Sequence, residues 1–245
     1  MIAFFVTVYF WGLMTVTSIL FIPVAALLRV ITEPFDRRLA LLHQFSCFWA
    51  SLYTWLNPWW SVSIQGREHL ERSRATVMVA NHQSFVDILV LYRLFTHFKW
   101  VSKAENFRVP FVGWNMSLNR YIRINRKSIR SAMQMMRDCE QALQEGSPVM
   151  MFPEGTRSPD GTLGSFKPGA FELALKARVP VQPIVINGSA RALPKRGWLL
   201  RGTHHIQVHV LPVVPVDTYA GDAAAQLSRS VRSVIEAELK KMRKH

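Results

Sequence analysis

The amino-acid sequence predicts an α/β protein with a mixed, largely parallel central sheet flanked by helices, and an N-terminal membrane-associated two-helix motif. From residue 61 onward, short apolar runs of strand length alternate with longer segments that have apolar residues at helical spacing, an alternation typical of α/β proteins. The first 60 residues consist mainly of two long uncharged stretches. We therefore predict a membrane-associated helical hairpin over residues 1–60 and an α/β domain over residues 61–245.

The first uncharged stretch is long enough to cross a bilayer. Residues 1–28 carry no charged side chain, and residues 2–22 would form a helix of about 30 Å, the thickness of a hydrocarbon core. Pro23 is expected to kink or end this helix, because proline cannot donate the backbone hydrogen bond. A cleaved signal peptide fits less well, because it would have a basic start and a shorter apolar run.

The second uncharged stretch, residues 39–66, has four tryptophans between positions 49 and 60, and tryptophan is enriched at membrane interfaces. Three arrangements of the helical pair are open: a hairpin that spans the bilayer, a hairpin inserted into one leaflet, and a soluble pair packed on the domain. Arg29, Arg37 and Arg38 lie at the tip. They favour the shallow insertion, since a spanning hairpin would be positive at both ends.

Within the α/β region, strands are predicted from short apolar runs. Two of these runs, at 76–80 and 148–152, are continuously apolar, as buried strands are, and the run at 61–64 reads as an edge strand ended by Gly66. The predicted strands are residues 61–64, 76–80, 99–102, 121–124, 148–152, 181–187 and 206–211.

Helices are predicted between these strands. The segment 107–118 is expected to be short and broken, because it contains Pro110 and Gly113. The segment 128–144 is amphipathic and is followed by Gly146, a natural helix C-cap. The predicted helices are residues 85–95, 107–118, 128–144, 169–177 and 222–242.

Charge points to an anionic partner. The formal net charge is +14, almost all of it after residue 60, which indicates nucleic acid, an acidic lipid surface or a phosphorylated substrate. The uncharged N-terminal stretch argues against nucleic acid. Cys47 and Cys139 lie too far apart in sequence to suggest a disulfide or zinc framework.

The stretch from Thr76 to Asp87 is the first candidate site. It places His82 in a turn between a buried strand and a helix, with Ser84 as a plausible N-cap. On one continuous helix His82 and Asp87 would lie about 140° apart. If His82 precedes the helix, its ring can fold back onto the Asp87 carboxylate, as in a catalytic triad. With no nucleophile beside the pair, it would act as a base on a substrate hydroxyl. The alternative is a structural histidine at a strand end.

The second candidate site is the segment 152–158, Phe-Pro-Glu-Gly-Thr-Arg-Ser, which also follows a buried strand. Gly155 permits close approach of a ligand, and Arg157 can bind a phosphate through two parallel hydrogen bonds. Thr156 and Ser158 add hydroxyl donors, and Glu154 could orient Arg157 or a substrate hydroxyl. The alternative is an ordinary polar turn. If both sites act together, His82 and Arg157 must face one pocket.

A basic segment supplies the third candidate. Arg120, Arg123 and Arg126 recur every third residue, so that on a strand Arg123 would face away from the other two. One or two could point into a site, and a solvated basic surface near acidic lipid is the alternative. Lys103 is a further cation near this segment.

Together these segments resemble, in order, the four motifs of the glycerolipid acyltransferase family. Residues 81–87 match its His-x₄-Asp motif and residues 152–158 match its third motif fully. Residues 103–126 resemble the second motif, residues 179–184 the fourth, and residues 166–170 are also similar to the family. The resemblance is strongest to bacterial lysophosphatidic acid acyltransferases, and it implies their glycerol-phosphate acyltransferase-like fold.

The resemblance implies roles for the candidate residues. His82, oriented by Asp87, would deprotonate the free hydroxyl of a lysophospholipid, which then attacks the thioester of acyl-CoA or acyl carrier protein. These are co-substrates, and no cofactor, metal or covalent intermediate is implied. Localisation at a bacterial inner membrane, with the catalytic domain on the cytoplasmic face, is also implied. The residues implied to hold the acceptor phosphate are Glu154, Gly155, Thr156, Arg157, Arg126 and Lys103.

Other interpretations stay open at this point. Arg120, Arg123 and Asn125 make the second motif more basic than is usual in the family, so another lysophospholipid or a lyso-aminolipid is an alternative acceptor. A non-catalytic basic membrane-binding module would explain the charge but not the His82–Asp87 pair. His204, His205 and His209 have no carboxylate or cysteine at metal-ligand spacing. Acyl-chain length, thioester donor and oligomeric state are left open.

Overall fold

The computed structural model describes residues 2–158, 160–193, 198–200, 202–219 and 223–244. Within these ranges seven strands form one sheet in the order β1-β7-β6-β2-β5-β3-β4. All neighbouring strands pair in parallel except β6 and β7, which are antiparallel. The predicted mixed, largely parallel sheet is therefore confirmed. The strands are β1 (Trp60–Gln65), β2 (Val77–Ala80), β3 (Lys99–Lys103), β4 (Ile122–Ile124), β5 (Val149–Met151), β6 (Val181–Asn187) and β7 (His204–Val210).

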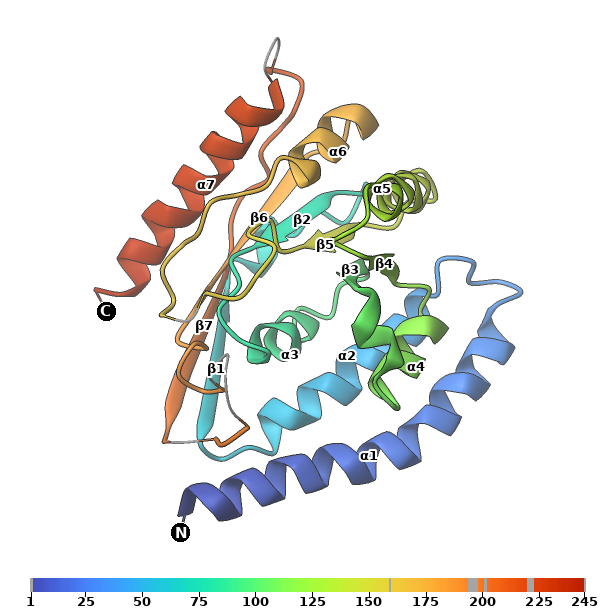
Figure 1. Ribbon diagram of the computed structural model, residues 1–245, viewed down its shortest axis with the longest axis vertical. Helices are drawn as coiled ribbons and strands as arrows, with labels where there is room; N and C mark the ends of the chain where they lie inside the picture. The colour runs from blue at the N-terminus through green and yellow to red at the C-terminus, as the bar shows by residue number, and fades with distance from the viewer. Residues whose placement is uncertain (1, 159, 194–197, 201, 220–222, 245) are drawn as a thin grey trace.

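Helices cover both faces of the sheet (Figure 1). Because strand side chains alternate between faces, Met78 and Ala80 of β2 pack toward α1–α3, whereas Val77 and Val79 pack toward α5–α7. The described helices are α1 (Ile2–Thr32), α2 (Ala40–Trp55), α3 (Val86–Tyr92), α4 (Val112–Leu118), α5 (Ile129–Gln144), α6 (Gly169–Ala177) and α7 (Ala223–Met242), with short 3₁₀ turns η1 (Arg67–His69) and η2 (Ala104–Arg108).

Most predicted elements are present with small shifts at their ends. The helix at 169–177 and the strand at 181–187 have the predicted bounds. The predicted break in segment 107–118 separates η2 from α4, where a Cβ on Gly113 would lie 2.3 Å from the Phe107 carbonyl oxygen. The predicted start of the last helix at residue 222 lies outside the described residues.

Pro23 does not end the first helix. The prediction allowed either a kink or an end at this residue. α1 continues through it to Thr32 and curves around the domain (Figure 1). Packing on both sides of the proline compensates for the missing hydrogen bond. Before it, Phe21 packs its ring against Phe45 and Trp49 of α2, and after it Ala25 is fully buried.

The second helix belongs to the core of the domain. α2 buries Leu42, Cys47, Trp49 and Tyr53, and the last three share one apolar cluster with the sheet. Its 16 residues span only about 24 Å, less than a hydrocarbon core of about 30 Å. A hairpin in which both helices cross the bilayer therefore does not describe this structure. The domain boundary at residue 60 stays a prediction.

The first helix has two different faces. One face packs on the domain, with Val6, Phe10 and Met14 buried. The opposite face exposes apolar side chains over its whole length, at positions about one or two turns apart. Among the described helices, α1 alone is long and apolar enough to cross a membrane, judged by length and composition. The exposed stripe of α1 is Phe5, Tyr9, Val16, Leu20, Leu27 and Ile31.

We expect α1 to contribute to folding stability through its inner face only. Phe10 is 1% exposed and contacts the rings of Tyr53 and Trp60, whereas Phe5 is 66% exposed. Phe10→Ala should lower the free energy of unfolding by about 3–5 kcal/mol, and Phe5→Ala by less than about 0.5 kcal/mol. Chemical unfolding in detergent measures both. Equal effects of the two substitutions would show that α1 does not belong to the folded core.

Candidate active site

His82 lies in a turn that is fixed from several directions. The turn follows β2, and Asn81 ties it to the neighbouring strand: its amide donates to the Ile186 carbonyl and accepts from the Ile186 N–H, both at 2.8 Å. The His82 ring stacks on Phe152, with ring centroids 3.8 Å apart and planes 10° apart. Phe152 directly follows β5, so two adjacent strand ends position the imidazole.

The predicted contact between His82 and Asp87 is present. Helix α3 begins at Val86, and His82 precedes it, so the ring folds back and its Nδ1 lies 2.8 Å from Asp87 Oδ2. The same carboxylate oxygen accepts the backbone N–H groups of Gln83 and Ser84. These contacts make Oδ2 an acceptor, which assigns the shared hydrogen to Nδ1 and leaves Nε2 as the basic nitrogen.

The helix start differs from the prediction by one residue. Phe85, rather than Ser84, is the N-cap of α3. The Asp87 carboxylate binds the N–H groups of Gln83 and Ser84, which lie ahead of the helix. Ser84 Oγ donates to the Leu193 carbonyl at 2.7 Å and also accepts the N–H of Val86, the first residue of α3, at 3.3 Å.

His82 and Arg157 line the same cavity, as the two-site interpretation requires. The cavity has a volume of about 570 Å³. Thr156, Arg126 and Lys103 also line it, together with apolar side chains of α1, α2 and α3, among them Met14, Trp49 and Leu89. The His82–Asp87 pair, several cationic side chains and apolar side chains therefore border one space.

Glu154 is placed differently from the expectation. Its carboxylate accepts the His82 N–H at 2.7 Å and the Gly164 N–H at 2.9 Å, and the side chain is buried. It does not line the cavity. Burial raises the pKa of this carboxyl, and the two N–H donors oppose that shift. Both oxygens hold the main chain, so we assign Glu154 to positioning of His82 rather than to phosphate binding.

Gly155 is also absent from the residues that line the cavity. It has φ +69°, and an added Cβ would lie 3.0 Å from Lys167 Cε. Glycine is thus needed here for the turn and for the close approach of Lys167.

Of the three regularly spaced arginines, only Arg126 lines the cavity. Partial burial lowers its pKa, and nearby Glu105 opposes this. Arg120 forms an ion pair with Glu33. Arg123 lies over the Phe107 ring at 4.6 Å. His205 and His209 lie on β7, apart from the cavity. His205 lies beside Ser61, and His209 is paired with Glu238.

Sequence reasoning missed Ser189, which donates its hydroxyl hydrogen to Asp87 Oδ1. Ser189 follows the end of β6, the strand beside β2. Its position in the sequence could have identified Ser189 as a site residue, because polar residues just after parallel strands gather at the carboxyl ends of the sheet.

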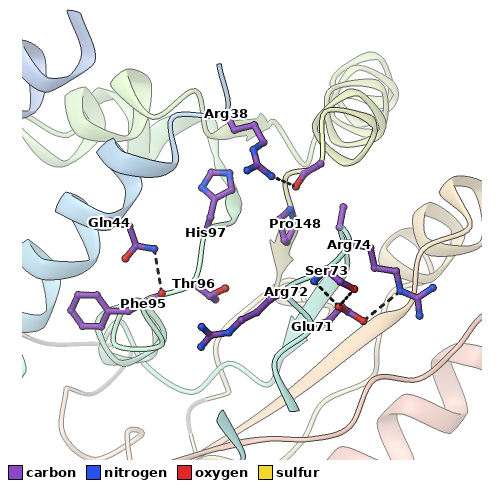
Figure 2. Close-up of a pocket in the computed structure, with 12 residues that line it drawn as sticks. Arg38, Gln44, Glu71, Arg72, Ser73, Arg74, Phe95, Thr96, His97 and Pro148 are labelled. Atoms are coloured by element: carbon purple, nitrogen blue, oxygen red, sulfur yellow. Dashed lines mark hydrogen bonds and ion pairs between the residues drawn. The ribbon is translucent and has the colours of Figure 1, made fainter. Parts of the chain in front are cut away.

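A second hollow lies at the amino ends of β2, β3 and β5, opposite the carboxyl ends of the strands that His82 and Phe152 follow. Its volume is about 330 Å³. Figure 2 shows His97 between Arg38 and Arg72, and Arg74 bonded to Glu71. Burial lowers the pKa of His97 to about 3, so this ring is neutral at physiological pH. Among the described contacts no carboxylate is bonded to His97, so the hollow lacks the paired histidine and carboxylate that the larger cavity has.

Comparison with known proteins identifies the wider group. Residues 61–187, just over half of the chain, match the family model described as Acyltransferase. A 1-acyl-sn-glycerol-3-phosphate acyltransferase from Chlamydomonas reinhardtii is 40% identical over 83% of this chain and 60% of its own length. The enzyme of that name from Pseudomonas aeruginosa is 32% identical over 80% of this chain and 76% of its own length.

Similarity extends to a solved structure. The crystal structure of the 1-acyl-sn-glycerophosphate (LPA) acyltransferase PlsC from Thermotoga maritima superposes with a TM-score of 0.79 at 22% identity, covering 99% of this chain and 96% of that one. This likeness shows a common fold. The chain spans 49–60% of the length of the first three curated relatives it matches.

We expect Glu154→Gln to change how stability depends on pH. The raised pKa of Glu154 means that, from about pH 4.5 upward to this pKa, the folded protein holds a proton that the unfolded chain has released. Wild-type stability should fall as pH rises through this window, and the glutamine variant lacks that loss. Thermal unfolding between about pH 4 and pH 8 should show the Tm of the variant rising relative to wild type. A difference in Tm that stays constant with pH would contradict a raised pKa of Glu154.

Proposed function

Because the chain belongs to the acyltransferase family, we propose that it transfers a fatty acyl group from a thioester donor to the free hydroxyl of lysophosphatidic acid, giving phosphatidic acid. The observation that supports this most directly is the shared cavity of the His82–Asp87 pair and Arg157. The names of the relatives support the same acceptor.

In the proposed mechanism His82 is the general base. Asp87 holds the Nδ1 hydrogen, and Nε2 accepts the proton of the acceptor hydroxyl as its oxygen attacks the thioester carbonyl carbon. The new ester C–O bond forms, the C–S bond breaks, and the leaving sulfur takes the proton from His82. No protein nucleophile is needed, because the substrate supplies the attacking oxygen and the thioester is already activated.

Acceptor binding would depend on the cationic rim. Arg157, Arg126, Lys103 and Thr156 line the same cavity as His82, and a phosphate monoester needs fixed cations and donors of this kind. With both its oxygens turned to the main chain, Glu154 does not oppose them. The reacting hydroxyl then lies close to the base, which supplies much of the rate enhancement expected for a positioned reaction.

The acyl chains would occupy the apolar inner part of the cavity, between α1, α2 and α3. The thioester donor is acyl-CoA or acyl carrier protein, and the proposed chemistry is the same for both. Another lysophospholipid or a lyso-aminolipid is the alternative acceptor, because the segment around Arg123 is more basic than is usual in the family.

We also propose that the protein binds an anionic membrane surface through the exposed stripe of α1. The inner face of this helix packs on the domain along its length, so the helix suits the plane of the interface rather than a span. Excess positive charge suits the anionic cytoplasmic leaflet, in keeping with a bacterial inner membrane and a catalytic domain on its cytoplasmic face.

Acyl transfer should depend on His82 and on the phosphate of the acceptor. In detergent, purified protein with lysophosphatidic acid and labelled acyl-CoA or acyl carrier protein should form phosphatidic acid, and monoacylglycerol should react far more slowly. His82→Ala should lower kcat by about 10²–10⁴-fold, the usual contribution of a general base. The control is His205→Ala, because His205 lies on β7, apart from the cavity.

Product formation that survives His82→Ala would disprove the mechanism. Turnover of another lysophospholipid but not of lysophosphatidic acid would favour the alternative acceptor. No turnover with any lysophospholipid would favour the non-catalytic membrane-binding module.

Membrane binding should depend on the exposed stripe of α1. Leu20 is 59% exposed, and Leu20→Glu should lower the partition coefficient onto anionic vesicles at least about tenfold, because an apolar contact with lipid is lost and a charge is added. Val234→Glu on α7 is the control, with a side chain that is 43% exposed. Vesicle sedimentation measures both. Equal losses would show that charge alone governs binding.

A further inference from the structure

The segment between β5 and α6 links the catalytic turn to the C-terminal helix. We call residues 161–167 of this segment the strap. Gly164 of the strap donates its N–H to Glu154 Oε2 at 2.9 Å, and Glu154 Oε1 accepts the His82 N–H at 2.7 Å. A Cβ added at Gly164 would lie 2.8 Å from Glu154 Oε2, so the strap and the carboxylate are in direct contact.

Helix α7 holds the strap from the other side. Arg232 donates from Nε to the Gly164 carbonyl at 3.1 Å and from Nη2 to the Leu163 carbonyl at 3.2 Å. Arg243 donates to the Gly161 carbonyl. Arg243 directly follows the last residue of α7, and its N–H donates to the Leu239 carbonyl as in a helix. Its spacing of eleven residues from Arg232 is close to three helical turns, so both arginines lie on the same side. Figure 1 shows the chain leading into α6 running alongside this helix.

The Arg232 side chain is itself held in place. Its Nη1 forms a 2.9 Å ion pair with Glu236, one turn further along α7. The guanidinium therefore has fixed partners on all three nitrogens: Glu236 and the two consecutive strap carbonyls. A planar fork can make two such contacts at once, which the single ammonium of a lysine does not reproduce.

We propose that Arg232 is a positioning residue for the reaction: through the strap and Glu154 it fixes the main chain of His82. The connection runs Arg232, Gly164, Glu154, His82, and each step is a hydrogen bond. The other side of the His82 peptide is held as well, because the Ser158 N–H donates to the His82 carbonyl at 2.8 Å. Arg232 lies outside residues 61–187, the part that matches the family model.

Two readouts test this proposal, and only one rests on the proposed function. Arg232→Gln should speed amide hydrogen exchange at His82 and Gly164, measured on the full-length protein in detergent without substrate. It should also lower kcat for lysophosphatidic acid by about tenfold or more, with KM nearly unchanged, because a displaced base slows the reaction more than it weakens binding. Arg232→Lys should fall between Arg232→Gln and wild type.

Arg229→Gln is the matched control. Arg229 is exposed on the same helix, and its substitution removes the same charge without touching the strap. Exchange and kcat should stay at wild-type values in this variant. If Arg232→Gln gives no folded protein, Arg232→Lys serves as the test, since it keeps the charge beside Glu236.

Unchanged exchange at His82 in the Arg232 variants would overturn the proposal. So would faster exchange spread over the whole chain, or equal losses in Arg229→Gln, because either would show a general loss of stability. If wild-type protein transfers no acyl group, the proposed function fails, and the exchange measurement still decides whether Arg232 fixes the His82 main chain.

Discussion

Asp87 is a carboxylate with no exposed surface, and the chain around it is arranged to supply its hydrogen bonds. The donors are the His82 ring, the N–H groups of Gln83 and Ser84, and the hydroxyl of Ser189. A buried group loses about 1–3 kcal/mol for each partner removed, and more when it is charged. The turn between β2 and α3 therefore cannot relax without leaving the carboxylate unpaired, and the imidazole inherits that rigidity.

A second buried carboxylate completes the arrangement. Asp87 orients the ring of His82, and Glu154 holds its backbone N–H. The stacked Phe152 ring limits rotation of the imidazole, since it covers one face. The position of Nε2 is thus set by contacts from α3 and from the segment after β5. Such preorganisation before substrate arrives suits the general-base role proposed for His82.

The amino-acid sequence predicted those features that depend on residues close to one another in the chain. The helix at 169–177 and the strand at 181–187 were predicted with their observed bounds, and the His82–Asp87 contact followed from five-residue spacing across a helix start. The hydrogen bonds of Glu154 were not predicted, because its partners His82 and Gly164 are brought together only by tertiary structure. Ser189 was missed for the same reason, being more than a hundred residues from Asp87. For α2, composition could not tell a lipid environment from a protein core, since both cover apolar side chains.

The two faces of α1 have a practical consequence. Trp11, Met14 and Ser18 on its inner face form part of the cavity wall, and Phe10 packs into the same core as Tyr53. Deleting an N-terminal apolar helix is a common route to a soluble fragment. Here the deletion would open the cavity to water on one side and uncover the rings of α2, replacing one exposed apolar face with another. The exposed apolar stripe and part of the cavity wall belong to the same helix, so shortening the chain cannot remove one without the other.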